Sequence, residues 1–448
     1  MTFAELGLHQ ALLKALADSG YGEPTPVQTR AIPAALGGQD LIVSAQTGSG
    51  KTAAFMLPAL HRLAARSQAA LSSSGLRQAG PWTTKGTHSA GRRFQPAQPV
   101  VLVLTPTREL AQQVTAAAGK YARQLPQVKV MAVVGGMPYA KQLQLLAGNP
   151  AIVVATPGRL VDHIRSRRID LSRLDTLVLD EADRMLDMGF AEDIEAIVAT
   201  TPASRQTLLF SATLDGIVGD MARRMTRDSE RIRVGAAAAG DEHIEQRLHF
   251  VDDLAHKNRL LDHLLRDATI GQALVFTATR RDADTVCDRL NLAGFSAAAL
   301  HGEMHQSARN RTLEAMRRGR LRILVATDVA ARGIDVPSIT HVFNFDLPRC
   351  AEDYVHRIGR TGRAGRGGLA ISLVNHGERF RVRKIESFTR QSIRIAVVAG
   401  HEPATRLPPA APRPAGKPAA KGGKLGGRGA RGGMAANSGR TGTARRGA

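Results

Sequence analysis

The sequence predicts an α/β protein of two tandem domains, each a parallel sheet flanked by helices, followed by a disordered basic C-terminal tail. Short runs rich in Val, Ile and Leu alternate with helical stretches in the first half of the chain, and the alternation restarts after residue 243. Continuous apolar runs of this kind are typical of buried parallel strands. Strands that alternate with helices form parallel sheets, so the repeated pattern indicates two domains.

The apolar runs also set the expected domain boundaries. The first domain should span residues 1–235 and the second residues 244–395, joined by a flexible linker of small residues at 236–243. The candidate strands begin at Leu41, Val100, Ala151, Thr176 and Thr207 in the first domain, and at Ala273, Ala297, Arg322, His341 and Leu369 in the second.

Two segments lack apolar periodicity and are expected to be disordered. Residues from about 67 to 98 are rich in Ser, Gly, Gln and Ala and interrupt the first domain. Residues 400–448 form a tail in which ten Lys and Arg side chains accompany one acid, Glu402. The Gly- and Arg-rich pieces of this tail favour affinity for RNA; a charged spacer without a ligand is the alternative.

The charge balance favours a polyanionic partner. The 448 residues include 61 Lys and Arg against 39 Asp and Glu, a formal net charge of +22, and each phosphate that such a surface neutralises releases counterions. Only Cys287 and Cys350 are present, at no metal-ligand spacing, which fits a reducing compartment. The sequence has no signal-like N-terminus and no apolar run of about 20 residues, so we expect a cytoplasmic protein without a membrane partner.

A glycine-rich loop, AQTGSGKT, follows the strand candidate at Leu41 and precedes a helical stretch. Strand, glycine loop and helix in this order form a phosphate cradle. Lys51 can contact the β and γ phosphates of a nucleotide, and Thr52 can hold Mg²⁺. The expected ATP-binding residues of this loop are Ala45, where the general pattern has Gly, and Gln46, Thr47, Gly48, Ser49, Gly50, Lys51 and Thr52.

Two carboxylates complete the expected hydrolytic site. Asp180 ends the strand candidate TLVLD, and Glu181 follows it. Phosphoryl transfer to water needs a metal, a positioned nucleophile and a nearby base. We therefore expect Asp180 to bind Mg²⁺ together with Thr52, and Glu181 to orient and deprotonate the attacking water.

With the string DEAD at residues 180–183 in place, the chain resembles the DEAD-box RNA helicases from Phe3 to about residue 375, and is most like the bacterial RhlE type. That resemblance implies two RecA-like domains and the cofactors ATP and Mg²⁺. It makes Gln28 the reader of adenine, with Phe3 packed on the base and Asp335 on the ribose. An amide suits adenine because it can both donate and accept.

The resemblance also assigns residues beyond the P-loop. Arg360 and Arg363 would be arginine fingers on the γ phosphate; a plain RNA-phosphate patch, into which Arg357 and Arg366 would fall, is the alternative reading of this basic run. The residues that would couple the ATP state to unwinding are Asp183, Ser211, Thr213 and His356. The residues that would contact RNA are Arg108, Gly136, Thr156, Arg159, Gln306, Arg309 and Thr327.

The expected function is therefore that of an ATP-dependent RNA helicase, in which RNA-stimulated ATP hydrolysis drives local, non-processive remodelling of RNA duplexes and RNA–protein complexes. Recognition through phosphate and 2′-hydroxyl would make RNA binding largely independent of sequence. Proteins of ribosome assembly or RNA decay are candidate partners. Two alternatives remain open at this point: a DNA helicase, and an ATP-gated RNA clamp or annealing chaperone.

Overall fold

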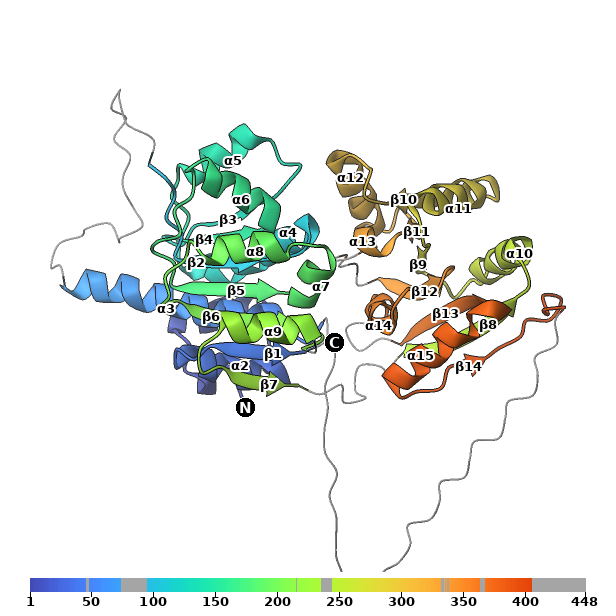
Figure 1. Cartoon of the computed structure of the whole chain (residues 1–448), viewed down its shortest axis with the longest axis horizontal. Helices are drawn as coiled ribbons and strands as arrows, with labels where there is room; N and C mark the ends of the chain where they lie inside the picture. Colours follow the sequence, from blue (N-terminus) through green and yellow to red (C-terminus); the bar gives the residue numbers. More distant parts are fainter. Residues whose placement is uncertain are drawn as a thin grey trace, which may run out of the picture. The chain divides into compact units, whose positions relative to one another are not determined.

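The computed structural model describes residues 1–45, 48–73, 95–214, 216–234, 244–331, 334, 336, 338–362 and 367–404. Within these ranges the chain forms two seven-stranded sheets, and all of their neighbouring strands run parallel. Helices lie on both faces of each sheet (Figure 1). This confirms the predicted fold class of two tandem RecA-like domains. The predicted linker at 236–243 lies outside the described residues.

The first sheet has the order β3-β4-β2-β5-β6-β1-β7. The strands β5, β6 and β1 are neighbours in the parallel sheet, so the loops that follow them emerge at one edge of it. The strands are β1 (Leu41–Ser44), β2 (Val101–Leu104), β3 (Val130–Val133), β4 (Ile152–Ala155), β5 (Thr176–Asp180), β6 (Gln206–Ser211) and β7 (Glu230–Arg233).

Alternate side chains of these strands enter two cores, one on each face of the sheet. Val43 and Phe210 join the core under α2, α3 and α4, whereas Ile42 and Leu209 join the core under α6, α8 and α9. The helices of this domain are η1 (Ala4–Leu6), α1 (Gln10–Asp18), α2 (Pro26–Leu36), α3 (Lys51–Ser73), α4 (Arg108–Tyr121), η2 (Ala122–Gln124), α5 (Tyr139–Leu146), α6 (Pro157–Arg165), α7 (Ala182–Asp187), α8 (Ala191–Val198) and α9 (Gly216–Met225).

The second sheet has the order β10-β11-β9-β12-β13-β8-β14. Counted from its own first strand, this is the strand order of the first sheet, so the two domains repeat one topology. The strands are β8 (Ile244–Val251), β9 (Gln272–Phe276), β10 (Ala297–Leu300), β11 (Ile323–Ala326), β12 (Ile339–Asn344), β13 (Gly368–Asn375) and β14 (Arg394–Ile395). The helices are α10 (Leu254–Leu265), α11 (Arg280–Leu292), α12 (Gln306–Arg317), α13 (Asp328–Ala331), α14 (Ala351–Ile358), η3 (His376–Glu378) and α15 (Arg379–Thr389).

The shared topology places a glycine-rich loop in one domain only. In the first domain the loop that contains Gly48 and Gly50 follows β1. At the equivalent place in the second domain β8 leads into α10 through Asp253, whose carboxylate accepts the amide of His256 at 2.7 Å as an N-cap. An N-cap carboxylate occupies the helix end where a phosphate would bind, so the topology supports a nucleotide cradle in the first domain alone.

The structure corrects three predicted boundaries, both ends of the insertion and the start of the tail. The insertion predicted at about 67–98 begins too early, because α3 continues to Ser73, and it ends too late, because buried Ala97 forms a β-bridge with Ile169. The tail predicted from residue 400 also begins later. His401 contacts His256 through its carbonyl at 3.0 Å, and the amide of Ala404 donates to Asp252 at 2.8 Å. Residues 74–94 and 405–448 lie outside the described part of the chain.

Candidate functional site

The loop after β1 has the backbone of a phosphate-binding loop. Gly48 and Gly50 have φ angles of +88° and +89°, a left-handed conformation that favours glycine. Lys51 begins α3, and its buried Nζ donates to the carbonyl of Ala45 at 3.0 Å. The N-terminal end of α3 and an ammonium therefore meet at one point, which is a favourable place for an anion. Gln46 and Thr47 lie outside the described residues.

The segment before α2 is fastened to this loop. The Thr25 hydroxyl donates to the carbonyl of Ser49 at 2.8 Å, and Gln28 Nε2 donates to the carbonyl of Gly50 at 3.1 Å. Gln28 Oε1 accepts the Thr25 amide at 3.0 Å, so the Gln28 side chain is held at both ends and is 3% exposed. A side chain at position 50 would collide with the Gln28 amide. This close approach favours glycine there, as does the positive φ angle. The structure thus brings the predicted adenine reader to the phosphate loop.

Phe3, the other predicted adenine contact, is buried. It is 6% exposed and packs edge-on against Tyr21 with the ring centroids 6.4 Å apart. The Tyr21 and Tyr121 hydroxyls are 3.0 Å apart, which links the N-terminal segment to α4. The contact of Phe3 with adenine stays a prediction.

Asp180 lies at the carboxyl end of β5, in the same edge of the sheet as the phosphate loop. Its side chain is 3% exposed, and Oδ1 has no hydrogen-bond partner among the described residues. Burial raises the pKa of Asp180 to about 7, although nearby Lys51 acts in the opposite direction. A buried, unsatisfied carboxylate oxygen is costly by itself and fits a cation. Asp180 and Thr52, the second residue of α3, are therefore the residues that could hold Mg²⁺.

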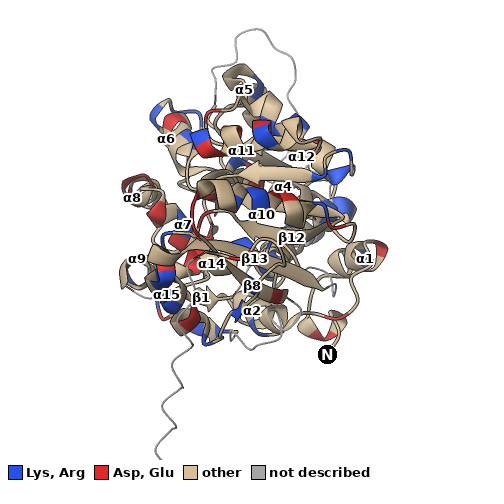
Figure 2. Ribbon diagram, turned by 90° about the vertical axis from the view of Figure 1, so that its right-hand side faces the viewer, with Lys and Arg blue, Asp and Glu red and all other residues tan. Residues whose placement is uncertain are grey.

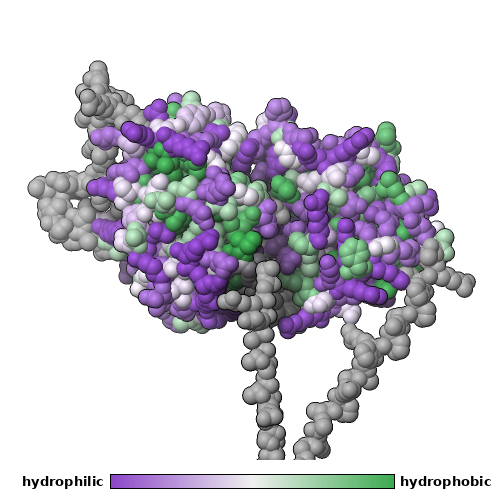
Figure 3. Space-filling view, in the orientation of Figure 1, coloured by the Kyte–Doolittle hydropathy of each residue, from purple (hydrophilic) through white to green (hydrophobic). Residues whose placement is uncertain are grey.

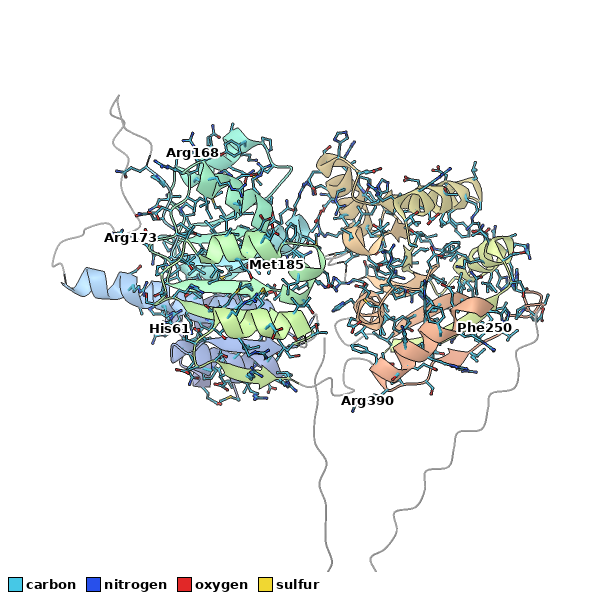
Figure 4. The ribbon with its side chains drawn as sticks, viewed as in Figure 1. His61, Arg168, Arg173, Met185, Phe250 and Arg390 are labelled. Carbon is cyan, nitrogen blue, oxygen red and sulfur yellow. The ribbon has the colours of Figure 1, made fainter. Side chains whose placement is uncertain are left out.

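Glu181 has a backbone φ of +54°, which is unusual for a residue with a side chain. Such left-handed residues cost about 1–3 kcal/mol and gather at functional sites. Its carboxylate is 5% exposed and lies 3.5 Å from Nε of Arg184, measured from Oε2. The strained backbone places Glu181 at the sheet edge directly after Asp180, where the predicted general base belongs. The helix α7, which begins directly after Glu181, can be found in Figure 4 by its labelled residue Met185.

Asp183 joins the segment after β5 to the segment after β6. Its Oδ2 accepts the amides of Ala212 and Thr213 at 3.0 and 3.1 Å, and its Oδ1 accepts the amide of Arg184 at 3.0 Å. The Ser211 hydroxyl accepts the amide of Asp183 at 3.3 Å and donates to the carbonyl of Thr213 at 2.6 Å. The structure therefore brings three of the four predicted coupling residues into one buried hydrogen-bond network.

The basic residues around α14 have distinct environments. Arg360 is 4% exposed, and it donates to the carbonyls of Ile334 at 2.8 Å and His356 at 3.2 Å. Arg360 and His356, with Arg184 of α7, line one small pocket. Arg360, the predicted arginine finger, therefore lies beside Arg184, a residue of the helix that begins directly after Glu181. Arg363 and Asp335 lie outside the described residues.

Arg357 does not belong to an RNA-phosphate patch, and that alternative is wrong for this residue. It is 2% exposed and forms a bidentate ion pair with Asp328, with N–O distances of 2.6 and 2.7 Å. Its guanidinium also lies 4.8 Å from the centroid of the Phe276 ring and donates to Asn344. Arg357 thus fastens α14 to α13 and to the sheet. Arg366 lies outside the described residues.

Two first-domain candidates for RNA contact, Arg108 and Gly136, lie together at the start of α4. Arg108 is the first residue of that helix, and its guanidinium occupies the space beside Gly135 and Gly136, where any side chain would collide with it. Gly136 also has a φ angle of +74°. Gly135, Gly136 and the Arg108 side chain therefore form one packed unit.

Residues of α12 contact this unit. Arg108 donates to Oε1 of Gln306 at 3.1 Å, and Gln306 Nε2 donates to Glu109 at 3.2 Å. Arg309 donates from Nε and Nη2 to the same Glu109 oxygen at 3.0 and 2.8 Å. The ion pair is nearly buried, with 10% and 7% of the side chains exposed. Sequence reasoning missed Glu109, although its place beside Arg108 in PTREL was the available signal.

The remaining candidates lie at strand ends. Thr156 is the N-cap residue of α6, and Arg159 in the same helix lies 3.5 Å from Asp162. Thr327 follows β11, is 8% exposed, and its carbonyl accepts the amides of Ala330 and Ala331. Each of these loops follows the carboxyl end of a parallel strand, where ligands of α/β sheets bind.

The surface agrees with the composition. Lys and Arg are conspicuous on α6, α12 and α15 (Figure 2), and the face in Figure 3 is mainly hydrophilic.

No group of three or more His, Cys, Asp or Glu within the described ranges could hold a metal by itself. Among the helices that the structure describes, none has the length and apolar character to cross a bilayer. Burial raises the pKa of the Cys287 and Cys350 thiols to about 11 and about 12, so both are unreactive as thiolates at neutral pH.

Comparison with known proteins agrees with this geometry. A DEAD/DEAH box helicase family model matches residues 25–220, and a helicase conserved C-terminal domain model matches residues 256–365. The chain is 42% identical over 408 residues to the ATP-dependent RNA helicase SrmB of Escherichia coli, which covers 91% of this chain and 86% of that protein. It is 43% identical over 392 residues to the ATP-dependent RNA helicase DeaD of the same species, which covers 88% of this chain and 58% of that protein.

A solved structure shares the fold as well. The structure of Saccharomyces cerevisiae Dbp5 bound to RNA and ADP BeF3 has a TM-score of 0.74 with 30% identity, and the match covers 89% of this chain and 95% of that one. Both family models, the SrmB relationship and the two repeated sheets lead to the same assignment. The chain therefore belongs to the DEAD-box family of ATP-dependent RNA helicases.

Proposed function

We propose that this enzyme hydrolyses ATP in response to RNA and uses the hydrolytic cycle to open short RNA duplexes locally. The observation that supports this most strongly is the meeting of Lys51, Asp180 and Glu181 after β1 and β5, the two strands that flank β6; Asp183 joins this site to the segment after β6. A phosphate cradle, a metal-binding carboxylate and a base suffice for hydrolysis. The Asp183 network provides a physical connection from that site to a second loop.

The nucleotide-binding step would rearrange contacts that are present in the structure. Lys51 would exchange the Ala45 carbonyl for phosphate oxygens, which are stronger acceptors for an ammonium. Mg²⁺, held by Thr52 and Asp180, would supply positive charge to the phosphates. Glu181 would hold the attacking water in line and accept its proton.

Gln28 would read adenine without releasing the phosphate loop. Its amide uses one donor hydrogen on Gly50 and one lone pair on Thr25, which leaves a second hydrogen and a second lone pair. Adenine offers one acceptor and one donor side by side, and could take both remaining positions. In this proposal the Gln28 side chain hydrogen-bonds both the base and the phosphate loop. A base that does not fit Gln28 would therefore also disturb the phosphate loop.

Arg360 and Arg363 would stabilise the charge that develops on the γ phosphate. Arg360 has five N–H donors, and its contacts with backbone carbonyls fix the orientation of its guanidinium. The neighbouring position of His356 in the same pocket supports a role for that residue in transmitting the nucleotide state. A finger in one domain and a phosphate cradle in the other would make hydrolysis depend on domain closure.

RNA would be held by Arg108, Gly136, Thr156 and Arg159 of the first domain, and by Gln306, Arg309 and Thr327 of the second. The hydrogen bond from Arg108 to Gln306 supports this proposal, because it connects candidate contacts from both domains. Backbone-directed contacts of this kind read shape and phosphate spacing, so the enzyme would accept many RNA sequences.

Finer assignments rest on the sequence. The basic residues between 405 and 448 would add RNA affinity by releasing counterions. A short basic tail after a compact core supports placing the enzyme near the RhlE type, and the two unpaired cysteines suit a reducing cytoplasm. Proteins of ribosome assembly or RNA decay remain the proposed partners.

Steady-state ATPase assays with no nucleic acid, with single-stranded RNA and with DNA of matched sequence test this function. We expect strong stimulation by RNA and weak stimulation by DNA. Equal stimulation by both would favour the DNA helicase alternative. Stimulation by RNA without displacement of a paired strand would favour the clamp or annealing alternative.

A further inference from the structure

One aromatic side chain beside the RNA-contact candidates has an exposed ring. Tyr139 is the first residue of α5, and it is 38% exposed. Its ring stacks on His163 of α6, with ring centroids 4.7 Å apart and planes within 3° of parallel. The helices α5 and α6 are neighbours in the first domain (Figure 1). One face of the Tyr139 ring is therefore supported by a fixed partner while much of the side chain remains open to solvent.

The support beneath the ring is rigid and uncharged. His163 is fully buried, and neither of its ring nitrogens has a hydrogen-bond partner among the described residues. Burial, and then the charge of Arg159, lower the pKa of His163 below its usual value. A neutral imidazole stacks on a phenol ring without drawing in water, so His163 holds Tyr139 in one orientation.

Arg159 connects this stack to the proposed RNA contacts. It precedes His163 by four residues, so the two side chains share one face of α6. The Arg159 guanidinium lies 5.9 Å from the Tyr139 ring centroid. A cation at this distance is attracted to the ring electrons, and it would also bind a phosphate placed next to the ring.

Tyr139 is also close along the chain to the glycine that packs against Arg108. Gly136, which packs against the Arg108 guanidinium, precedes Tyr139 by three residues. Three residues of extended chain span at most about 10 Å. The Tyr139 ring thus has Arg159 next to it, and the chain joins it within three residues to the glycine against which Arg108 packs.

We propose that the solvent-exposed part of the Tyr139 ring stacks on one base of the RNA strand that Arg108 and Arg159 hold by its phosphates. This inference rests on the proposed RNA-binding function and adds a base contact to it. Aromatic side chains bind single-stranded nucleic acid in this way together with cations, and the contact is tolerant of sequence because every base has a flat face. Stacking of one base contributes about 5- to 150-fold in affinity.

A purely architectural role for Tyr139 makes a different prediction. In that role the ring would serve only to fasten α5 to α6 through His163. Its loss would then weaken RNA binding, if at all, by displacing Arg159, and the effect would be the same whether or not a base is present in the RNA. The two roles are therefore separable by removing bases from the RNA one at a time.

The experiment measures binding of the full chain to labelled single-stranded RNA by fluorescence anisotropy, with a non-hydrolysable ATP analogue present. A series of RNAs carries one abasic nucleotide, moved along the strand. We expect the wild type to lose about 5- to 150-fold in affinity at one position of this series. Tyr139→Phe should keep that profile. Tyr139→Ala should bind intact RNA more weakly and be insensitive to the missing base at that position.

Leu145→Ala is the matched control, because it removes another exposed apolar side chain of α5, 44% exposed, and should leave the abasic profile of the wild type unchanged. An abasic profile of Tyr139→Ala identical to that of the wild type would overturn the inference, as would a flat profile of the wild type. Wild-type protein that binds no RNA at all would instead refute the proposed function itself.

Discussion

Replacing Asp183 with Asn tests whether the network between the carboxylates and the segment after β6 couples hydrolysis to duplex opening. The substitution keeps the shape of the side chain and removes its charge. In the wild type Oδ2 accepts two backbone amides, of Ala212 and Thr213, while Oδ1 accepts the amide of Arg184. Both oxygens of the carboxylate are thus in use as acceptors.

An Asn side chain cannot satisfy this arrangement, because one of its two ends is a donor. Turned either way, it faces at least one backbone amide with its own NH₂ group. The smallest loss is therefore one hydrogen bond to a charged group, which is worth about 1.5–3 kcal/mol. At 1.4 kcal/mol for each factor of ten, the population of the connected state should fall by about ten- to hundredfold.

The assay follows ATP hydrolysis and RNA strand displacement in the same reaction and takes the ratio of strands displaced to ATP consumed. We expect Asp183→Asn to lower this ratio by about tenfold or more, with nucleotide affinity changed only slightly, because the hydrogen bonds of the Asp183 carboxylate within the described residues go to Arg184, Ala212 and Thr213. Asp288→Asn, which removes an exposed carboxylate of α11, should leave the ratio unchanged. An unchanged ratio in Asp183→Asn, or a parallel loss of both activities, would refute the coupling role.

Four further changes test other parts of the site. Glu181→Gln should bind ATP and RNA with wild-type affinity yet lose about 10²- to 10⁴-fold in ATPase rate; near-normal turnover would remove it as the base. Arg360→Ala should lose about 10³- to 10⁵-fold in RNA-stimulated ATPase rate and keep nucleotide-free RNA affinity, with Arg360→Lys as the charge-matched comparison. A double-mutant cycle of Glu109→Gln and Arg309→Ala, read from the apparent KM for RNA, should give a coupling of about 1.5–3 kcal/mol, whereas additive effects would exclude the bridge. Deleting residues 405–448 should weaken RNA binding and flatten its dependence on salt, while ATPase at saturating RNA persists; an unchanged salt slope would make the tail a spacer.

Nine of the ten strands that the sequence predicted are mostly buried, and the tenth, β10, is a partly buried edge strand that its alanine-rich run still marked. All ten apolar runs became strands, from β1 with its pattern LIVS to β13. The four that were missed are edge strands or mixed in polarity. In β7 only Ile232 is buried, β14 has two exposed residues, and β8 carries Glu245, Gln246 and Arg247 among its apolar positions. Edge strands lack the continuous apolar run on which the prediction depends.

The site was predictable where a single short segment carries the chemistry. The phosphate loop and the carboxylates follow buried strands directly, so their meeting could be foreseen from parallel-sheet geometry. Contacts between distant segments could not. Three such contacts depend on tertiary packing. They are the hydrogen bond from Gln28 to Gly50, the ion pair of Arg309 with Glu109, and the buried ion pair of Arg357 with Asp328. For Arg357 the sequence showed only a basic run, and its burial reversed the expectation of an exposed patch.

Multiple-turnover displacement of one strand from a short RNA duplex tests the central claim most directly. The reaction is followed with a labelled strand for the wild type and for Glu181→Gln, with ATP, with ADP and without nucleotide. The account predicts sustained displacement only by the wild type with ATP. ATP hydrolysis stimulated by RNA but without displacement, or displacement that is equally fast without nucleotide, would contradict it.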